Sequence, residues 1–417
     1  MDKKAVAIIV GGGPAPGING VICAATIEAI NRGHKVYGIN TGFKRISAGD
    51  KTAVEELTIS KVSRIDREGG SVLGTSRTNP RKDPKMLENV VSMLNELNVG
   101  YLVTIGGDDT VSSARAVAIA AGGDLSVAHV PKTIDNDLPI PGHECTFGYH
   151  SAREVGTEIT ETLMVDAKTT SRWYLVVAMG RKAGHLALGI GISAGATLTL
   201  IPEEFKGREG KVPLGEIADI ICGSIIKRLV NGRPHGVVVL AEGLAELLDQ
   251  STVPELQNAE KDPHGHIRFA EVDFGGMIKR AVRARLDELG IQDLLVVDKN
   301  VGYELRCRPP VPFDREYTRE LGFGVIDFLT TGGRDAMIIR DGNRLRPLPF
   351  TEIIDAETGK SRVRMVDLDS ITYQVAQKYM IKLKAEDLAS SEFVNSAASI
   401  ANIPGEQFVK EFTRVVD

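Results

Sequence analysis

Short, largely apolar runs alternate with longer helical patterns along this chain, and this alternation restricts its fold more than any other feature. A strand that is covered on both faces needs a continuous apolar run rather than an alternating one. We therefore predict an α/β fold built on doubly wound parallel sheets. The predicted strands are 5–10, 35–40, 101–105, 127–130, 174–179, 236–241, 294–298 and 336–340. The predicted helices are 17–32, 84–98, 111–121, 151–169, 214–230, 275–289 and 314–330.

At 417 residues the chain is too long for one core, because a single hydrophobic core stops growing at roughly 250–300 residues. We therefore expect two domains, and we place a crossing of the chain between them near Thr146. Beyond Arg346 strand-like and helical patterns are mixed, and the sequence assigns no role to this tail.

Composition and charge exclude several classes of protein. Hydrophobic residues make up 42% and charged residues 25%, as in an ordinary globular protein. Fifty Lys and Arg against 55 Asp and Glu give a formal charge of −5 without a long block of one sign, so we expect no nucleic-acid partner. No run approaches the roughly 18 apolar residues of a membrane span, and the four cysteines form no CxxC pair. We expect a cytoplasmic protein with no membrane partner and with reduced, buried thiols.

A glycine-rich turn follows the first predicted strand. The run Gly11-Gly12-Gly13-Pro14 leads directly into a helical pattern. Glycines at such a turn let backbone N–H groups approach an anion, and the N-terminus of the helix adds its positive dipole end. The spacing departs from GxGxxG and no P-loop lysine follows, so a purely structural tight turn is an equally good interpretation.

Paired glycines and paired carboxylates follow the third predicted strand. The run Gly106-Gly107-Asp108-Asp109 stands at the carboxyl end of that strand, where open α/β sheets bind their ligands. The glycines clear space for a phosphate, and a carboxylate there is suited to hold Mg²⁺. Capping of the next helix by Asp109 or Thr110 is the alternative, but it does not explain paired acids after paired glycines.

The fourth predicted strand ends in Pro131-Lys132-Thr133, and Asp135 and Asp137 follow. A carboxylate beside an alcohol is able to act as a general base, a second one assists with Mg²⁺, and an ammonium group neutralises a transferred phosphoryl group. Asx turns are the alternative, because Asp and Asn favour them. Two acid-bearing strand ends in succession favour phosphoryl transfer.

Four arginines are candidate phosphate anchors, since a guanidinium binds phosphate through two parallel hydrogen bonds. A single surface arginine is usually only solvated, so none of the four is strong evidence alone. They are Arg77, Arg172, Arg181 and Arg306. Glu242 stands at the end of another strand and is placed to accept a hydrogen bond from a sugar hydroxyl.

In order and spacing these motifs resemble those of the 6-phosphofructokinase family. The matching motifs are the glycine turn at 11–19, GGDDT at 106–110, PKTIDND at 131–137, MGR at 179–181 and AEG at 241–243. The resemblance covers Ala5 to about Arg340. It implies two Rossmann-like, three-layer α/β/α domains with the active site in the cleft between them. It also implies Mg²⁺-dependent transfer of a phosphoryl group to the 1-hydroxyl of fructose 6-phosphate, a reaction of glycolysis and gluconeogenesis.

The resemblance implies domain bounds and catalytic roles. Residues 1–146 with about 304–345 are expected to bind the phosphoryl donor, and 147–303 with about 346–417 to bind fructose 6-phosphate. The expected base for the 1-hydroxyl proton is Asp135, assisted by Asp137, and the expected Mg²⁺ ligand is Asp108. Thr133 and Lys132 are expected at the phosphoryl group in transfer, and the donor is expected to contact Gly12, Gly107, Asp109 and Lys132.

The resemblance also implies a set of acceptor contacts. Arg172 matches a residue that is supplied across a subunit interface, which implies a homo-oligomer, either a dimer or a tetramer. The other contacts of fructose 6-phosphate that the resemblance implies are Met179, Gly180, Arg181, Glu242, Tyr303 and Arg306. Arg77, a candidate phosphate anchor, is expected to bind the same substrate.

Two positions bear on the identity of the phosphoryl donor. ATP-dependent members usually read GGDGS and PGTIDND, whereas this chain has Asp109 and Lys132 in place of glycines. Both changes, together with Tyr303 in place of a histidine, are similar to the pyrophosphate-dependent branch. A carboxylate at Asp109 would repel an α-phosphate by about 4 kcal/mol at about 4 Å and an effective dielectric of about 20, before screening. Lys132 is then placed to clamp pyrophosphate.

Three alternatives stay open. An ATP-dependent 6-phosphofructokinase is distinguished by its donor. A noncatalytic regulatory subunit is opposed by the intact Asp108, Asp135, Asp137 and Arg181. A dinucleotide-binding oxidoreductase fits the first glycine turn but not the paired acids. The first predicted helix has no arginine at 21–27, so we do not expect control by a nucleotide at the place that is usual in the family.

Overall fold

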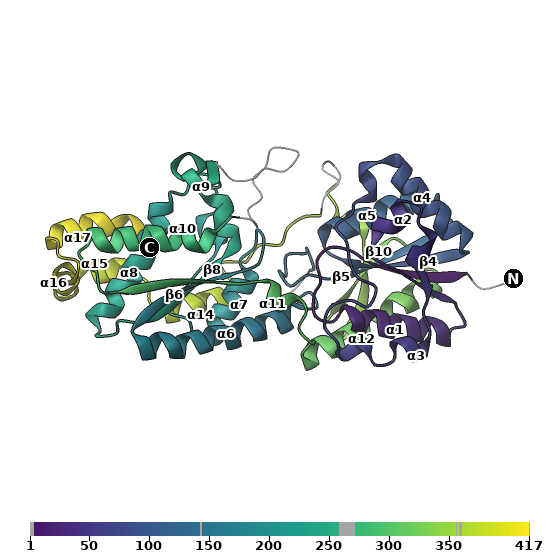
Figure 1. The fold of residues 1–417 in the computed structure, drawn as a ribbon, viewed down its shortest axis with the longest axis horizontal. Coiled ribbons are helices and arrows are strands. Elements are labelled where there is room, and N and C mark those ends of the chain that lie inside the picture. The colour runs from purple at the N-terminus through teal and green to yellow at the C-terminus, as the bar shows by residue number, and fades with distance from the viewer. Residues whose placement is uncertain (1–3, 142–143, 258–271, 356, 358–360, 417) are drawn as a thin grey trace. The chain divides into compact units, whose positions relative to one another are not determined.

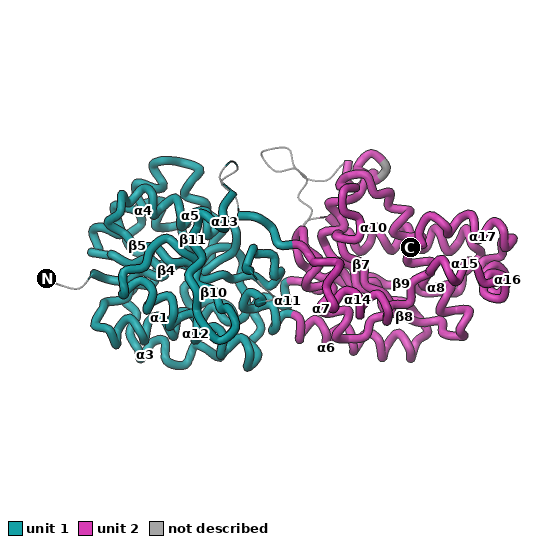
Figure 2. Tube along the Cα trace, turned by 180° about the vertical axis from the view of Figure 1, so that it is seen from behind, with its two compact units in different colours: residues 1–152, 303–364 teal, residues 153–302, 365–417 magenta. Residues whose placement is uncertain are grey.

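The computed structural model describes residues 4–141, 144–257, 272–355, 357 and 361–416. The chain forms two compact units, coloured separately in Figure 2. Unit 1 comprises Met1–Ala152 and Tyr303–Arg364, and unit 2 comprises Arg153–Gly302 and Met365–Asp417. The chain therefore passes from one unit to the other three times.

The sheet of unit 1 has the strand order β11-β10-β5-β4-β1-β2-β3. Its five inner strands are parallel, and β3 and β11 are antiparallel edge strands. The chain continues from β1 to β2 on one side and returns to β4 on the other, so the strand order reverses between β1 and β4. Such a reversal opens a crevice at the carboxyl ends of the strands. The strands are β1 (Ala5–Val10), β2 (Val36–Ile39), β3 (Val54–Glu56), β4 (Val99–Gly106), β5 (Ser126–Pro131), β10 (Ala336–Asp341) and β11 (Arg344–Pro349).

Helices cover both faces of this sheet, with α1 and α12 on one side and α2, α4 and α5 on the other (Figure 1). Alternate residues of β1 enter the two cores: Val6 and Ile8 pack with α1 and α12, whereas Ala7 and Ile9 pack with α4 and α5. This two-sided burial explains the continuous apolar run. The helices are α1 (Ile18–Asn31), α2 (Phe43–Ser47), α3 (Ile59–Val62), α4 (Pro84–Glu96), α5 (Asp108–Ala120), α11 (Tyr303–Arg306), α12 (Pro312–Thr330) and α13 (Phe350–Ile353).

Unit 2 has a four-stranded parallel sheet in the order β7-β8-β6-β9. The strands are β6 (Arg172–Ala178), β7 (Leu198–Leu200), β8 (Gly236–Ala241) and β9 (Leu295–Val301). Its helices are α6 (Tyr149–Thr170), which begins at the end of the first segment of unit 1, α7 (His185–Ala194), α8 (Leu214–Val230), α9 (Pro254–Gln257), α10 (Phe274–Glu288), α14 (Ile371–Tyr379), α15 (Ala385–Ala389), α16 (Ser391–Ile400) and α17 (Gly405–Phe412).

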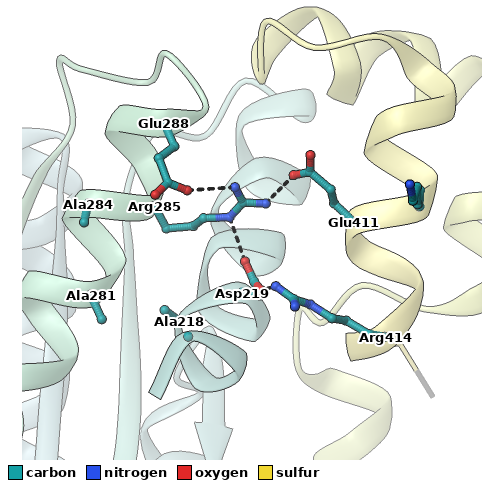
Figure 3. A pocket seen from close by; sticks show the side chains of 10 residues that line it. Ala218, Asp219, Ala281, Ala284, Arg285, Glu288, Glu411 and Arg414 are labelled. Carbon is teal, nitrogen blue, oxygen red and sulfur yellow. Dashed lines mark hydrogen bonds and ion pairs between the residues drawn. The ribbon is translucent and has the colours of Figure 1, made fainter. Parts of the chain in front are cut away.

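The tail completes unit 2. Helix α16 packs on α8 and on α17, whose aromatic residues Phe408 and Phe412 are fully buried. Charged groups attach the end of the chain: the buried carboxylate of Asp219 on α8 accepts hydrogen bonds from Arg285 on α10 and from Arg414 (Figure 3). The tail is therefore a structural part of this unit.

The sequence-based prediction of an α/β fold is confirmed, and all eight predicted strands and seven predicted helices are present. Strands β3 and β7 were missed because they have only three residues each, and β11 because its two prolines and exposed residues suit only a sheet edge. Pairing of β11 with β10 keeps residues 344–349 in unit 1, so the chain returns to unit 2 at Met365 rather than near residue 346.

Two further expectations concern chemistry away from the sheets. All four cysteines lie in the described part of the chain and none forms a disulfide, but only Cys23 and Cys222 are buried, and Cys307 is exposed. Burial of all four thiols was therefore a wrong prediction. Among the described helices, none combines the length and apolar character that a membrane span requires.

Candidate active site

The glycine turn after β1 lies against the end of β4. The amide of Gly11 donates to the carbonyl of Ile105, and the amide of Gly12, with a φ of 81°, donates to the carbonyl of Ser76 at 2.9 Å. A Cβ atom at Gly11 or at Gly106 would collide with the buried side chain of Thr110. These two glycines therefore allow Thr110 to fill the space between the two strand ends.

Lys132 connects the ends of three neighbouring strands. Its backbone amide donates to Gly106 at 2.8 Å, and its Nζ donates to the carbonyl of Gly13 at 2.5 Å. A Cβ atom at Gly12 would lie 3.2 Å from Nζ, so glycine leaves room beside the ammonium group. The side chain is buried, with 5% of its surface exposed.

Burial sets the charge of Lys132. Removal from water lowers the pKa of its ammonium group to about 8, and the positive charge of Arg306 acts in the same direction. The carboxylates of Asp135, Asp108 and Asp137 act in the opposite direction. The structure therefore gathers three acids from two strand ends around one buried cation.

The paired acids after β4 occupy the first turn of α5. The N-cap is Gly107, which has no side chain, so neither Asp109 nor Thr110 has the capping role that the sequence left open. Both Asp108 and Asp109 lie in the first turn of α5, at the positive end of the helix dipole. Asp109 is exposed, so solvent screening reduces the repulsion that we estimated from the sequence.

The loop after β5 buries its two acids. Asp135 and Asp137 are each 7% exposed, and between them Asn136 adopts a φ of 56°. Asparagine tolerates this left-handed conformation better than most residues. The amide of Asp135 donates to the hydroxyl of Thr133 at 3.0 Å, and the carbonyl of Thr133 accepts from Thr146 at 2.6 Å. Two buried carboxylates beside a cation are suited to proton transfer next to an anionic ligand.

His129 supports the glycines after β4, and the sequence analysis missed it. It is fully buried in β5, its Nδ1 accepts from Thr104 at 2.9 Å, and its Nε2 donates to the carbonyl of Gly106 at 2.9 Å. Burial lowers the pKa of this imidazole to about 3, so the ring is neutral near pH 7. A polar residue inside an otherwise apolar strand was the signal that could have identified it.

Three of the expected acceptor contacts lie in unit 1. The guanidinium carbon of Arg306 is 3.5 Å from the place where a Cβ atom of Gly13 would be, and it lies 5.0 Å from the ring centroid of Tyr303. Tyr303 is 72% exposed. Arg77 is exposed and follows Ser76, which pairs with the glycine turn. Arg306 therefore adds positive charge to the same glycine turn as Lys132.

The remaining acceptor candidates lie in unit 2, where β6 and β8 end. The carboxylate of Glu242 accepts from the amides of Gly180 and Arg181, each at 3.3 Å, and the amide of Met179 donates to Val301 at 3.0 Å. Arg181 has a φ of 51°. The motifs MGR and AEG thus form one contiguous group at the carboxyl edge of this sheet.

Arg172 stands apart from this group within unit 2. It begins β6, whereas Met179 follows the end of the same strand. Seven residues of extended strand separate the two by roughly 20 Å. Its guanidinium lies 4.0 Å from Asp166 of α6.

Glu203 supports the end of the MGR loop and was also missed by the sequence analysis. This buried carboxylate accepts from the amide of Gly184, which precedes α7, and from the amide of Val366, each at 2.9 Å. Burial raises the pKa of this carboxyl group. An acid directly after an apolar strand and a proline was the available signal.

Within the described residues, no group of three or more His, Cys, Asp or Glu side chains is arranged to hold a metal ion by itself. Mg²⁺ seldom requires one, because it commonly binds through one or two carboxylates together with phosphate oxygens. The carboxylate oxygens of Asp108 and its neighbours near Lys132 fit that kind of site.

Comparisons with known proteins agree with this geometry. The profile of the family described as phosphofructokinase matches residues 5–329. The pyrophosphate–fructose 6-phosphate 1-phosphotransferase of Naegleria fowleri is 49% identical over 98% of this chain and 95% of its own length. The protein of the same name from Thermotoga maritima is 49% identical over 97% of each chain.

The solved phosphofructokinase structure of Saccharomyces cerevisiae has a similar fold. It aligns with 98% of this chain at a TM-score of 0.67 and 21% sequence identity. The present chain spans 50% of the length of that chain. At this level of identity the likeness concerns the fold alone.

The neutral state of His129 predicts a measurable pH dependence of stability. Because the pKa of His129 is lower in the folded state, the contribution of His129 to the free energy of unfolding is fully present above about pH 6.5. That contribution is lost as the pH falls from there toward about 3. Between pH 7.5 and 5.5 the wild type should lose about 1.4 kcal/mol more free energy of unfolding than His129→Gln, in urea titrations. Equal losses in the two proteins would contradict this assignment.

Proposed function

This chain belongs to the phosphofructokinase family, and on that premise we propose that it transfers a phosphoryl group reversibly from pyrophosphate to fructose 6-phosphate. The products are fructose 1,6-bisphosphate and phosphate. The names of the two relatives at 49% identity support this reaction. The observation that carries it is the buried ammonium group of Lys132, which lies between the glycine turn and the acids.

Asp135 is the proposed general base. Its carboxylate takes the proton of the 1-hydroxyl, the oxygen of that hydroxyl attacks the terminal phosphorus of pyrophosphate, and the bond from this phosphorus to the bridging oxygen breaks. Phosphate leaves with the electron pair of that bond. Asp137 assists the proton transfer, and the hydroxyl of Thr133 accepts a hydrogen bond from the amide of Asp135. In the reverse direction Asp135 returns the proton, as microscopic reversibility requires.

Asp108 is the proposed ligand of Mg²⁺. The ion, when bound, neutralises charge on the phosphate oxygens. Lys132 and Arg306 supply fixed positive charge on the side of the glycine turn, and Gly12 and Gly107 leave the space that the phosphates occupy. This arrangement stabilises negative charge without reorganisation during the reaction.

Lys132 and Asp109 together select the donor. The ammonium group of Lys132 occupies the place where an ATP-dependent relative has a glycine, and Asp109 adds a negative charge at the start of α5. Because Asp109 is exposed and screened, we assign the larger share of the selection to Lys132. Pyrophosphate, which carries no nucleoside, is the donor that fits.

In unit 2 the proposed contacts of fructose 6-phosphate are Met179, Gly180, Arg181 and Glu242. From the family resemblance, Arg77, Tyr303 and Arg306 of unit 1 are also proposed to bind this substrate. Arg172 is too far along β6 to reach the MGR group of its own unit. Because Arg172 matches a residue that family members supply across a subunit interface, we propose that it serves the site of a partner subunit and that the active protein is a homo-oligomer. The residues 1–152 with 303–364 form the proposed donor-binding domain, and the rest forms the acceptor-binding domain.

Donor selection predicts distinct results for three variants in assays of fructose 1,6-bisphosphate formation with pyrophosphate or ATP. Wild type should use pyrophosphate at least about tenfold better than ATP. Lys132→Gly should lose at least about tenfold in kcat/KM for pyrophosphate, since a buried charge pair to the ligand is removed. Asp109→Gly alone should gain little with ATP, whereas the double variant should gain more.

The control variant is Lys206→Gly, which removes an exposed lysine. Its kinetics with pyrophosphate and with ATP should match those of the wild type. Unchanged pyrophosphate kinetics in Lys132→Gly would contradict the role of Lys132. Activity of the wild type with ATP alone would contradict the proposed donor while leaving the family assignment intact.

The position of Arg172 predicts complementation between subunits. Arg172→Ala and Asp135→Asn should each be inactive, but a hybrid oligomer contains sites with an intact Asp135 from one subunit and an intact Arg172 from the other. Denaturing, mixing and refolding the two variants together should restore about a quarter of the wild-type activity for a dimer. No recovery in oligomers that are shown to be mixed would place Arg172 in its own subunit's site.

A further inference from the structure

One arginine, Arg364, holds the loop that carries Asp135 and Asp137. It is the last residue of unit 1 and lies in the tail, to which the sequence analysis assigned no role. Its backbone amide donates to the carbonyl of Asp137 at 2.7 Å. Its Nε and Nη2 donate to the carbonyl of Asn136 at 3.2 and 3.0 Å.

The same guanidinium extends this contact to the rest of the loop. Nη2 also donates to Oδ1 of Asn136, and Nη1 donates to the carbonyls of Ile140 at 3.2 Å and of Glu144 at 2.8 Å. The five donors of a guanidinium lie in a fixed plane, so one side chain satisfies acceptors from three parts of the loop.

Asn136 passes this restraint to the residues on either side. Its Oδ1 also accepts from the amide of Thr146 at 3.1 Å, and the hydroxyl of Thr146 donates to the carbonyl of Thr133. The left-handed φ of Asn136 separates the two acids and needs support from its surroundings. Arg364 supplies that support through both the backbone and the side chain of Asn136.

The cost of burying the charge of Arg364 indicates a specific role for this residue rather than packing alone. Burial lowers the pKa of the Arg364 guanidinium, and the nearby Asp137 opposes that effect. An apolar side chain would avoid the desolvation cost but would leave the loop carbonyls without donors. The buried guanidinium of Arg364 is therefore best explained by its hydrogen bonds, which fix the geometry of the loop that carries Asp135 and Asp137.

We propose that Arg364 is a positioning residue for the phosphoryl-transfer reaction, acting through the main chain of Asn136 and Asp137 rather than by contact with a substrate. This inference rests on the proposed function, because its principal test uses that reaction. A displacement of a catalytic group by about 1 Å is able to cost about 100-fold in rate.

The test compares Arg364→Ala and Arg364→Lys with Arg362→Ala, an exposed arginine two residues earlier in the same segment. We expect Arg364→Ala to lose about 100-fold in kcat while the KM values for pyrophosphate and fructose 6-phosphate stay within about threefold, the signature of an interaction that serves the transition state. Arg364→Lys keeps a charge but not the planar fork, and should also lose at least about tenfold in kcat. Arg362→Ala should retain wild-type kcat.

Two further readouts separate positioning from a general loss of structure. Millimolar guanidinium should raise the kcat of Arg364→Ala, whereas methylammonium should not, and neither ion should activate Arg362→Ala. Hydrogen exchange of the amides between Thr133 and Thr146 should be faster in Arg364→Ala than in Arg362→Ala, with exchange in unit 2 unchanged.

Wild-type kcat in both Arg364 variants would overturn the inference. If Arg364→Ala fails to fold, full activity of a folded Arg364→Lys would also overturn it. A loss of kcat that accompanies global unfolding in both variants, with no response to guanidinium, would also overturn it. Failure of the proposed function is distinguishable, because the wild type itself would then be inactive with pyrophosphate and fructose 6-phosphate.

Discussion

A lysine buried at the meeting point of three parallel strands is the constraint on which the rest of the site depends. Burial of the Lys132 ammonium group is costly unless it has hydrogen-bond acceptors and opposite charges. The structure supplies the Gly13 carbonyl and the acids at 108, 135 and 137. Glycine at position 12 suits this arrangement, because its φ of 81° disfavours a side chain and a Cβ atom there would lie 3.2 Å from the ammonium nitrogen. The strand ends therefore hold a buried ammonium group within the electrostatic reach of three carboxylates.

Buried polar groups outside the proposed set of ligand contacts hold the neighbouring loops in place. His129 fixes the carbonyl of Gly106, and Arg364 fixes the loop that carries Asp135 and Asp137. In unit 2, Glu203 does the same for the start of α7. Each makes its hydrogen bonds largely to backbone atoms, so each restrains loop geometry rather than chemistry. The strand ends carry the groups proposed to react, and these buried polar residues restrain the adjoining loops.

The sequence was informative where burial or chemistry leaves a local signature. Continuous apolar runs predicted the eight principal strands. The motifs PKTIDND and GGDDT predicted acids at two strand ends, and the structure places these acids near Lys132. Supporting residues left weaker signals: Arg364 stands between two apolar residues in a tail without a motif, and its partners are 220 or more residues away in the chain. Edge strand β11 and the helices of the tail depend on tertiary packing that local patterns do not encode.

The most direct test of the account is the pH dependence of pyrophosphate affinity in wild type and in Lys132→Arg. The lowered pKa of Lys132, about 8, means that the wild type loses its charge as the pH rises above that value, so affinity should fall by up to about tenfold per pH unit. Arginine stays charged, and ionisation of pyrophosphate itself is common to both proteins. The ratio of the two dissociation constants should therefore change steeply above about pH 8. A ratio that stays constant from pH 6.5 to 9.5 would contradict the account.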